Sequence, residues 1–426
     1  MEIELLYQNF KECSSVSTDT RKLSKDCMYV ALKGDNFDGN KFVAKAFEGG
    51  AKYCVVDDKE AVLNTNCILV DDALTSLQML AMFHRSVINV PIIALTGSNG
   101  KTTTKELINA VLATTYNVKA TIGNLNNHIG VPLTLLSFSE DLDFGIVEMG
   151  ANHQKEIEFL CQIAKPNYGL ITNFGKAHLE GFGSVEGIIN GKSELYDFLR
   201  AHNNIALINT EDNRQLTQID DYSKTITFGP ALNNDCIIKF KNANPFVTLN
   251  YDDVEINSQL IGDYNYGNIA VAVAIGKHFK VSTKNIKKAI ENYRPDNNRS
   301  EIINKGTNKI ILDAYNANPT SMLAALKNFK QLEVDNKYLF LGDMFELGNS
   351  AEKEHQFIVN YIKNNFEDNT FLVGENFYKT NTNDNILKFS SFEDLKPLLK
   401  SLKLSNANLL IKGSRGMALE RILDLI

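Results

Sequence analysis

Short apolar runs alternate with helical stretches along most of the chain, and this pattern predicts an α/β fold. Runs of four or five residues begin at Ile92, Gly145, Gly169 and Ile205, and segments with helical spacing separate them. Strands that are apolar throughout are typical of a parallel sheet, because helices cover both of its faces. We therefore expect a central, P-loop-type and mostly parallel sheet.

The beginning of the chain predicts a smaller α/β domain. Apolar runs at 28–32 and 53–56 lie between glycine-rich turns. Residues 74–87 have helical spacing, and Pro91 follows them, which indicates a connecting helix and then a boundary. We expect residues 1–88 to form this domain.

The second half of the chain predicts two further changes of architecture. Residues 224–262 alternate polar and apolar positions, which favours an antiparallel addition to the central sheet. The turn-rich segment 295–298 then precedes a new alternation of strands and helices. We expect a central domain at 89–296 and a Rossmann-like domain at 297–426.

Composition excludes several classes of function. The formal net charge of -7 disfavours a nucleic-acid partner, because such surfaces need clustered cations. No apolar stretch is long enough to span a membrane, and the first ten residues do not resemble a signal peptide. Six cysteines without a paired spacing favour reduced thiols, and therefore a cytoplasmic protein.

A glycine-rich stretch predicts a phosphate-binding loop. Thr96-Gly97-Ser98-Asn99-Gly100-Lys101-Thr102-Thr103 follows an apolar strand and opens a helix, so its backbone N–H groups are available to an anion. Lys101 supplies a charge for the β- and γ-phosphates of ATP, and Thr102 a hydroxyl for Mg²⁺. Leu95 stands where the usual pattern has its first glycine, so this is a shortened variant, and a chance match is the alternative.

Glu148 is the first candidate for a second magnesium ligand. It ends an apolar strand and precedes Met149-Gly150, which places a carboxylate at the edge of the sheet where ligands of α/β proteins bind. A carboxylate that merely faces solvent at a strand end is the alternative interpretation.

Taken together, these motifs resemble those of the Mur ligases of peptidoglycan synthesis. The phosphate loop and the strand that ends at Glu148 carry the resemblance, with four further blocks. These are Asn-Leu-Asn-Asn-His-Ile-Gly-Val-Pro-Leu at 124–133, Asn-Phe-Gly-Lys-Ala-His-Leu at 173–179, Asp-Ala-Tyr-Asn-Ala-Asn-Pro at 313–319 and Leu-Gly-Asp-Met-Phe-Glu-Leu-Gly at 341–348. The resemblance covers nearly all of residues 15–420.

The resemblance implies an ATP-dependent ligase that adds D-alanyl-D-alanine to UDP-N-acetylmuramoyl-tripeptide through an acyl phosphate. It also implies two Mg²⁺ ions, held by Thr102, Glu148, His178 and a Lys192 modified by CO₂, with Lys101 as a further catalytic residue. From the residues alone, Lys192 reads as a solvated lysine of an amphipathic helix and His178 as a surface histidine. A ligase of this kind completes its own cleft, so we expect a monomer.

Nucleotide-binding roles follow from the same resemblance. Asn265 and Asn268 correspond to positions near the adenine, although helix capping is the simpler interpretation. Arg299 is assigned to phosphate and Asp313 to ribose. Tyr264 stands where many relatives have histidine, which puts the adenine contact in doubt.

Substrate-binding residues are also implied. The hydroxyl-rich segment before Arg21 resembles a uridine-diphosphate loop, although a polar helix cap has the same composition. The segment 412–417 follows a buried strand and, we expect, opens the last helix, where it meets a substrate carboxylate. The complete predicted set is Ser17, Thr18, Asp19, Arg21, Asn126, Asn127, Tyr315, Asn316, Asn318, Lys412, Ser414 and Arg415.

Three alternatives remain at this stage. Another Mur-type ligase and a folylpolyglutamate synthetase share the ATP chemistry. Relatives that add diaminopimelate carry Asp-Asn-Pro-Arg in their last domain, whereas residues 296–299 read Asp-Asn-Asn-Arg and lie at the domain join. A non-catalytic regulator that binds a nucleotide or UDP-sugar is the alternative from a different class.

Overall fold

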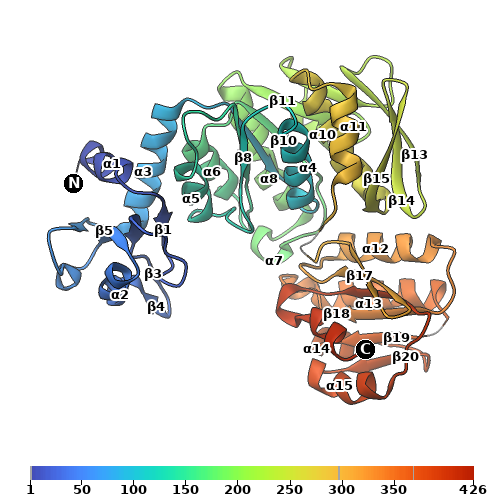
Figure 1. The fold of residues 1–426 in the computed structure, drawn as a ribbon. Coiled ribbons are helices and arrows are strands. Elements are labelled where there is room, and N and C mark those ends of the chain that lie inside the picture. The colour runs from blue at the N-terminus through green and yellow to red at the C-terminus, as the bar shows by residue number, and fades with distance from the viewer. Residues whose placement is uncertain (1, 296–297, 368) are drawn as a thin grey trace.

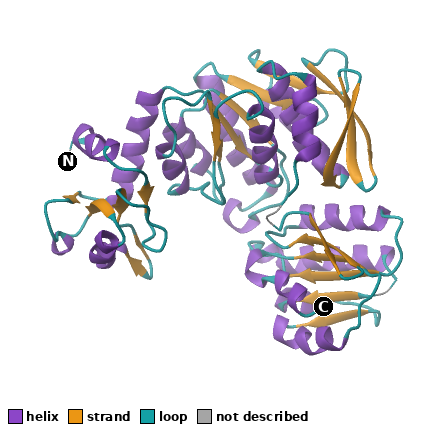
Figure 2. Cartoon of the chain, in the orientation of Figure 1, coloured by secondary structure: helices purple, strands orange, loops and turns teal. Residues whose placement is uncertain are grey.

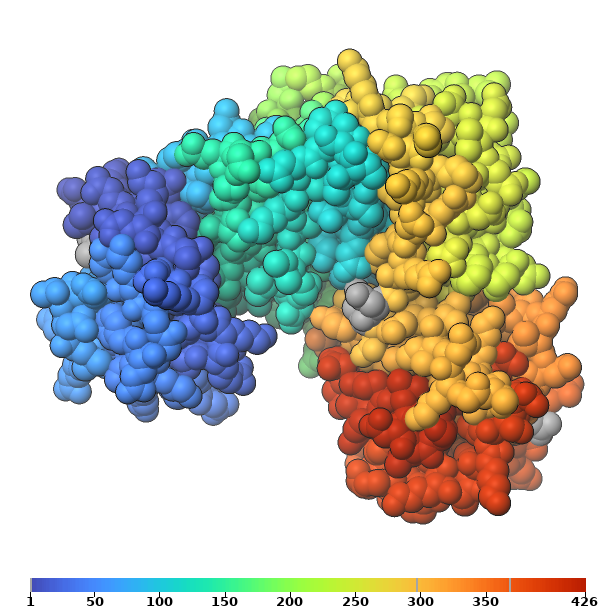
Figure 3. Space-filling view, viewed as in Figure 1, coloured from blue at the N-terminus to red at the C-terminus, as the bar shows by residue number. Residues whose placement is uncertain are grey.

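The computed structural model describes residues 2–295, 298–367 and 369–426. The chain forms an N-terminal, a central and a C-terminal unit, each built around its own main sheet (Figure 1). The N-terminal and C-terminal units flank the central one, and an open hollow separates them below it (Figure 3). The expected boundary between 296 and 297 lies outside the described residues, and the domain limits stay a prediction.

The N-terminal unit contains a four-stranded parallel sheet in the order β1-β2-β5-β6. The helix predicted at 74–87 is confirmed: the Asp72 carboxylate caps its first turn through the Thr75 N–H, and Asn89 ends it with a left-handed φ of 45°. The α-helices and strands of this unit include α1 (Ile3–Lys11), β1 (Val16–Ser17), β2 (Cys27–Val30), β3 (Lys33–Gly34), β4 (Phe37–Asp38), α2 (Val43–Glu48), β5 (Ala51–Val56), β6 (Cys67–Leu69) and α3 (Ala73–Ile88).

The central unit is built on a nine-stranded sheet in the order β15-β14-β13-β12-β11-β10-β7-β9-β8. Its strands and helices include β7 (Ile92–Thr96), α4 (Lys101–Leu112), β8 (Val118–Ala120), α5 (Gly130–Leu136), β9 (Phe144–Glu148), α6 (Glu156–Ala164), β10 (Tyr168–Ile171), α7 (Leu179–Phe182), α8 (Val185–Ala201), β11 (Ile205–Asn209), α9 (Asn213–Ile219), β12 (Thr225–Gly229), β13 (Cys236–Ala243), β14 (Phe246–Tyr251), β15 (Val254–Ile261), α10 (Tyr266–His278) and α11 (Thr283–Asn292).

The predicted mostly parallel sheet is confirmed, with one correction at its far end. β13, β14 and β15 pair antiparallel, as expected, and stand together at one end of the unit (Figure 2). β12, however, lies in the segment expected to be antiparallel and pairs parallel with β11 and β13. Its alternating burial arises because it lies near the end of the parallel sheet, where cover is less complete.

The order of the central strands places the site. β7 lies between β9 and β10 and is parallel to both. The register pairs Leu95 with Glu148 and Thr96 with Ile171, so the segments after these strands leave the sheet at one edge. Ligands of α/β sheets bind at such an edge, where neighbouring connections diverge.

The C-terminal unit has a six-stranded sheet in the order β16-β17-β21-β18-β19-β20. β16 is antiparallel to β17, and the other pairs are parallel, as a Rossmann-like unit requires. Its elements include β16 (Glu301–Lys305), β17 (Asn308–Asp313), α12 (Pro319–Gln331), β18 (Lys337–Gly342), α13 (Ala351–Asn365), β19 (Thr370–Val373), α14 (Glu375–Tyr378), β20 (Ile386–Phe389), α15 (Phe392–Ser401) and β21 (Asn408–Lys412).

The prediction of a last helix after β21 is wrong. The chain instead makes two short 3₁₀ turns, Arg415–Met417 and Leu419–Asp424. Ala418 separates them with a left-handed φ of 46°, which interrupts any continuous α-helix. The segment therefore lacks the aligned N–H groups that an α-helix terminus would offer to an anion.

The apolar residues of the predicted strands are buried in the cores of these units. In the part of the chain that the structure describes, every helix is too short or too polar to cross a lipid bilayer.

Candidate functional site

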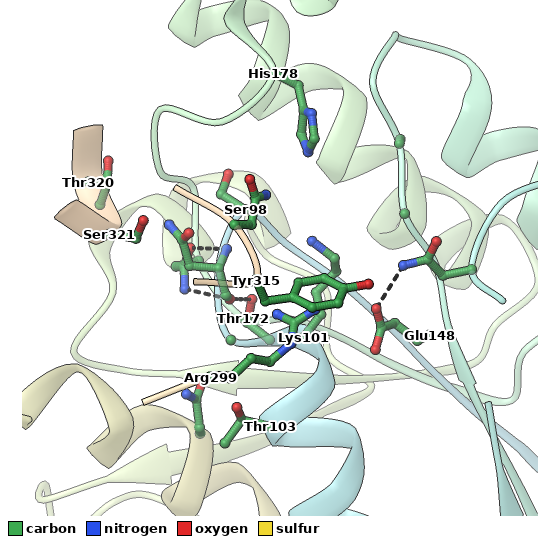
Figure 4. A pocket seen from close by; sticks show the side chains of 18 of the residues that line it. Ser98, Lys101, Thr103, Glu148, Thr172, His178, Arg299, Tyr315, Thr320 and Ser321 are labelled. Carbon is green, nitrogen blue, oxygen red and sulfur yellow. Dashed lines mark hydrogen bonds between the residues drawn. The ribbon is translucent and has the colours of Figure 1, made fainter. Parts of the chain in front are cut away.

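A cavity of about 1260 Å³ lies between the central and C-terminal units. The central unit contributes residues from the phosphate loop, from the end of β9 and from the segment after β10. The C-terminal unit contributes Arg299, Asp313, Tyr315 and Glu346, among others. Figure 4 shows side chains from both units converging on this space. The cavity therefore depends on both units for its walls.

The geometry of the phosphate loop requires glycine at two positions. Gly97 has φ +143°, and a Cβ there would lie 2.0 Å from Thr172 Oγ1. Gly100 has φ +79°, and its Cβ would lie 2.5 Å from Asn268 Oδ1. A side chain at either position would meet both a backbone penalty and a clash. The backbone of the loop thus packs closely against Thr172 and Asn268, and residues of the loop also line the cavity.

Lys101 and Asn99 are fixed by contacts within the central unit. Lys101 Nζ donates to the Gly97 carbonyl at 2.7 Å, and burial lowers its pKa while the Glu148 carboxylate opposes that shift. The Asn99 carbonyl accepts from Thr172 Oγ1 at 2.6 Å and from Asn173 Nδ2 at 3.0 Å. The segment after β10 therefore braces the phosphate loop.

Glu148 and Thr102 present buried oxygen atoms without partners. Glu148 is 1% exposed, and its Oε1 accepts from Asn126 Nδ2 at 2.8 Å. Among the described residues, Glu148 Oε2 and Thr102 Oγ1 have no hydrogen-bond partner. Leaving a buried polar atom unpaired costs about 1–3 kcal/mol. A carboxylate and a hydroxyl are the hard oxygen donors that Mg²⁺ prefers, so the donor set fits this ion.

His178 lies across the cavity from the phosphate loop and points into it (Figure 4). It precedes α7 with a left-handed φ of 56°. Its Nδ1 contacts Oε2 of Glu346, which comes from the C-terminal unit. The adjacent His178 ring lowers the pKa of Glu346.

Lys192 is fully buried on α8, so its interpretation as a solvated lysine is excluded. Its Nζ donates to the Ala151 carbonyl at 3.2 Å and lies 5.0 Å from the centre of the Phe182 ring. Burial holds the pKa of Lys192 well below its usual range, and the nearby Lys101 cation lowers it further. Ala151 lines the cavity, so Lys192 lies directly behind the cavity wall.

The predicted metal ligands do not form a ready-made cluster of acidic and histidine side chains. Within residues 2–295, 298–367 and 369–426, no three or more His, Cys, Asp or Glu side chains gather closely enough to hold a metal ion. Glu148 and Thr102 nevertheless each keep a buried oxygen without a hydrogen-bond partner among the described residues.

Asn265 and Asn268 line the cavity and are linked to each other. Asn268 accepts from Thr104 Oγ1 at 3.0 Å and donates to Asn265 Oδ1 at 2.8 Å. Asn265 in turn donates to the Ile261 carbonyl at 2.8 Å. Asn268 packs directly against Gly100, so these linked amides support the phosphate loop.

On the C-terminal side, the predicted nucleotide and substrate residues are held by one another. The Arg299 guanidinium lies over the Tyr315 ring, 3.9 Å from its centre. Asp313 Oδ2 accepts from Lys412 Nζ at 2.6 Å, and the Asn316 carbonyl accepts from the same amine at 3.2 Å. Tyr264 shares a hydrogen bond with Ser300.

Direct contacts join the phosphate loop to the C-terminal unit. Asn318 caps α12 through the Ser321 N–H, and its Nδ2 also donates to Asn99 Oδ1 at 2.7 Å. Nearby, Lys176 Nζ contacts Glu354 Oε1 at 2.6 Å, and the Lys176 N–H donates to Thr320 Oγ1 at 3.0 Å. Asn99, Lys176 and Asn318 lie in the sequence blocks that carry the family resemblance, whereas Thr320 and Glu354 lie outside them, and no local pattern predicts that these residues meet.

Several predicted substrate residues lie apart from the cavity or serve the fold. The segment 17–21 belongs to the N-terminal unit, where Arg21 pairs with Asp19 at 2.8 Å and lowers the Asp19 pKa to about 2. Ser17 Oγ accepts from the Asp19 N–H at 3.2 Å, and Thr18 lies between them. Asn127, by contrast, lines the cavity, and its Oδ1 accepts from the Gly130 N–H at 2.9 Å at the start of α5.

The predicted substrate residues in the turn after β21, Ser414 and Arg415, already have partners within the protein. Ser414 Oγ accepts from the Phe345 N–H at 2.8 Å. Arg415 is exposed and pairs with Glu420 at 2.8 Å. The sequence assigned no role to Glu346, Lys176 or Glu354. Lys176 and Glu346 lie in the blocks 173–179 and 341–348, which could have drawn attention to them, but Glu354 lies in neither block.

Comparisons with known proteins agree with this architecture. The Mur ligase middle domain matches residues 95–276, the Mur ligase glutamate ligase domain matches 298–415, and the Mur ligase family catalytic domain matches 12–85. The chain is 36% identical to the UDP-N-acetylmuramoyl-tripeptide--D-alanyl-D-alanine ligase of Bacillus subtilis, over 96% of this chain and 93% of that relative. It is 34% identical to the enzyme of the same name from Escherichia coli, over 96% and 92%.

Solved structures show the same fold. The crystal structure of MurF from Acinetobacter baumannii has a TM-score of 0.84 at 27% identity and covers 99% of this chain and 97% of that chain. MurF from Thermotoga maritima, solved with ADP, has a TM-score of 0.84 at 23% identity, over 98% and 97%. On the strength of these matches along nearly its whole length, the chain belongs to the Mur ligase family.

Proposed function

We propose that this protein is an ATP-dependent ligase that adds D-alanyl-D-alanine to UDP-N-acetylmuramoyl-tripeptide, giving the pentapeptide, ADP and phosphate. The observation that carries this proposal is one cavity that combines a phosphate loop, Glu148 and residues of the C-terminal unit. Relatives at 36% and 34% identity bear the name of this activity. Such a precursor enzyme would work in the cytoplasm.

The residues of the cavity suit a two-step reaction. The terminal carboxylate of the tripeptide attacks the γ-phosphorus of ATP, ADP leaves, and an acyl phosphate forms. The amine of D-alanyl-D-alanine then attacks the activated carbonyl, and phosphate leaves with the amide bond formed. Lys101 and the N–H groups of the loop face the charge that develops on phosphate oxygens. The walls from both units keep water from the acyl phosphate.

Thr102 and Glu148 would hold Mg²⁺, which supplies positive charge to the phosphate oxygens when it is bound. Lys101 neutralises charge on the same side of the cavity. In the nucleotide, Asn265 and Asn268 would contact the adenine, Arg299 a phosphate and Asp313 the ribose.

We also infer that Lys192 carries a carbamate. Reaction with CO₂ requires an unprotonated amine, and burial of Lys192 favours that state. The product is an anion that extends the side chain toward the cavity behind Ala151, where it and His178 would hold a second Mg²⁺. Incubation with ¹³C-bicarbonate should give a carbamate carbon signal in the wild type; an equal signal from Lys192→Met would contradict the assignment.

The substrate would span the three units, which we propose as domains at 1–88, 89–296 and 297–426. Ser17, Thr18, Asp19 and Arg21 would bind the uridine diphosphate end. The peptide end would reach Asn126, Asn127, Tyr315, Asn316 and Asn318, and Lys412, Ser414 and Arg415 would lie near a substrate carboxylate. The protein would act as a monomer.

The test is mass spectrometry of the product formed from Mg²⁺, ATP, UDP-N-acetylmuramoyl-tripeptide and D-alanyl-D-alanine. We expect UDP-N-acetylmuramoyl-pentapeptide from the wild type and none from Lys101→Ala. ATP turnover with a different acceptor would assign another ligase of the superfamily. ATP binding without any amide product would favour the regulator, and consumption of ATP only with both substrates excludes it.

A further inference from the structure

The loop at residues 343–348 joins the C-terminal unit to the segment that follows β10. Glu346 lies in this loop, and its Oε2 contacts Nδ1 of His178. The Glu346 carbonyl also accepts from the Glu180 N–H at 3.1 Å. A backbone contact and a side-chain contact therefore hold the same residue against the start of α7. This arrangement fixes Glu346 relative to His178 at two points.

The loop is also held from behind, by buried groups of the C-terminal unit. The Asp343 carboxylate accepts from the N–H groups of Asn376 and Phe377, both at 2.9 Å. The Met344 N–H donates to Nε2 of the buried His355 at 3.0 Å. With the Phe345 N–H on Ser414, consecutive residues are anchored up to Glu346. The backbone that leads to Glu346 is thus held by hydrogen bonds, and the Glu346 side chain is half-exposed.

Both partners have unusual backbone conformations. His178 has φ +56° and Glu346 has φ +61°. Left-handed backbone at a residue other than glycine costs roughly 1–2 kcal/mol. Such strain persists where the surrounding structure imposes it, and it gathers at functional sites. Here the two strained residues meet each other on the wall of the cavity.

We propose that Glu346 is a positioning residue for His178. Its carboxylate would accept a hydrogen bond from Nδ1–H, which would fix the ring orientation and leave Nε2 as the basic nitrogen. A carboxylate behind a histidine sets the tautomer and the aim of the ring in this way. The C-terminal unit would thereby complete the reaction centre in the central unit. The proposal rests on the proposed function only for the consequence in catalysis.

A simpler role for Glu346 is to dock the two units, and the chain offers a matched control for it. Glu354 is also an acidic residue of the C-terminal unit, and it pairs with Lys176, two residues before His178. It does not contact the His178 ring. If docking alone mattered, neutralising Glu354 would reproduce the effect of removing the Glu346 carboxylate.

The experiment reads the tautomer of His178 directly. Protein labelled with ¹⁵N-histidine is examined by long-range ¹H–¹⁵N NMR at a pH well above the ordinary imidazole pKa, and His178→Gln assigns the signal among seven histidines. We expect a protonated Nδ1 in the wild type and in Glu354→Gln. In Glu346→Ala the signal should move toward the Nε2-protonated form. An unchanged tautomer in Glu346→Ala would overturn the proposal, even if no ligase activity were found.

Steady-state kinetics provides the second reading. Loss of such a supporting partner typically costs about 10–100-fold, so kcat of Glu346→Ala should fall within that range with KM for ATP little changed. Glu346→Gln keeps an oxygen that accepts from Nδ1 and should recover part of kcat. An equal fall of kcat in Glu354→Gln would assign Glu346 to docking. Absence of pentapeptide from the wild type would refute the proposed function and leave the NMR result standing.

Discussion

Two turns of this molecule follow a buried parallel strand and contain glycine, serine and lysine, yet they differ in what they offer to an anion. The loop after β7 opens the 12-residue helix α4, and Lys101 stands after its glycines. The turn after β21 leads into 3₁₀ turns, and Lys412 stands before its glycine as the last residue of the strand.

The position of the lysine explains the difference. Lys101 lies at the start of a helix, beside the cavity and with N–H groups around it. Lys412 also lines the cavity but is 1% exposed, and its amine donates to Asp313 and to the Asn316 carbonyl, so its charge is already paired. A strand followed by Lys-Gly-Ser is therefore insufficient evidence for an anion site. The loop after β7 differs in that an α-helix begins at its lysine and no carboxylate of the described residues pairs with that lysine's amine, which donates to the Gly97 carbonyl.

The largest expected effects come from replacing these two lysines: one substitution should lower kcat, and the other should lower the free energy of unfolding. Lys101→Ala should lower kcat by at least about 100-fold, because it removes charge stabilisation of the transferring phosphate, with the free energy of unfolding little changed. Lys412→Met should instead lower the free energy of unfolding by about 3 kcal/mol, because it leaves Asp313 without its partner. Product mass spectrometry and urea unfolding measure the two effects. Equal losses of stability would contradict the comparison.

A smaller difference is expected between one glycine of each turn, Gly97 and Gly413, when each is replaced by alanine and the affinity for ADP is measured. Gly97→Ala combines a φ of +143° with a contact of 2.0 Å, so affinity for ADP should fall about tenfold or more. A Cβ at Gly413 would lie 3.1 Å from Gly342 Cα without a positive φ, so Gly413→Ala should leave the affinity within about threefold. Titration calorimetry with ADP measures both. Similar affinities for the two variants would show that the loop yields more easily than its geometry indicates.

The smallest expected effect concerns the pH dependence of stability. His355 accepts from the Met344 N–H, and the next residue, Phe345, donates to Ser414 in the turn after β21. Burial lowers the pKa of His355 from 6.5, so the unfolded chain takes up a proton first as pH falls. The free energy of unfolding should therefore decrease below pH 6.5, by at most about 1.4 kcal/mol per pH unit from this group, and be fully retained above it. His355→Gln can still accept from Met344 and should flatten this dependence. Parallel curves for the two proteins in urea unfolding would exclude His355 as the cause.

Local patterns predicted much of the fold and part of the site. Apolar runs located the strands β7, β9 and β10, and glycine spacing located the loop that they support, because these signals act over a few residues. The pairing of β12 and the turn after Lys412 were mispredicted, because both depend on neighbours distant in the sequence. The contact between His178 and Glu346 joins residues far apart in the chain, and no local pattern encodes it. For the same reason, the burial of Lys192 contradicted its amphipathic context.

The hydrogen bond between Asn318 and Asn99 has a mechanical consequence. It lies at one end of α12, a helix of 13 residues. A rotation of the helix about this hydrogen bond would therefore move its far end most and the end at the phosphate loop least, like a lever about its pivot. At 1.5 Å per residue the lever is about 20 Å long, and turning it by about 10° would carry its far end by roughly 3 Å. The pivot itself would hardly move. A swing of the C-terminal unit about this point would thus keep its contact with the phosphate loop, while the contacts of Glu346 and Glu354 with the central unit would open.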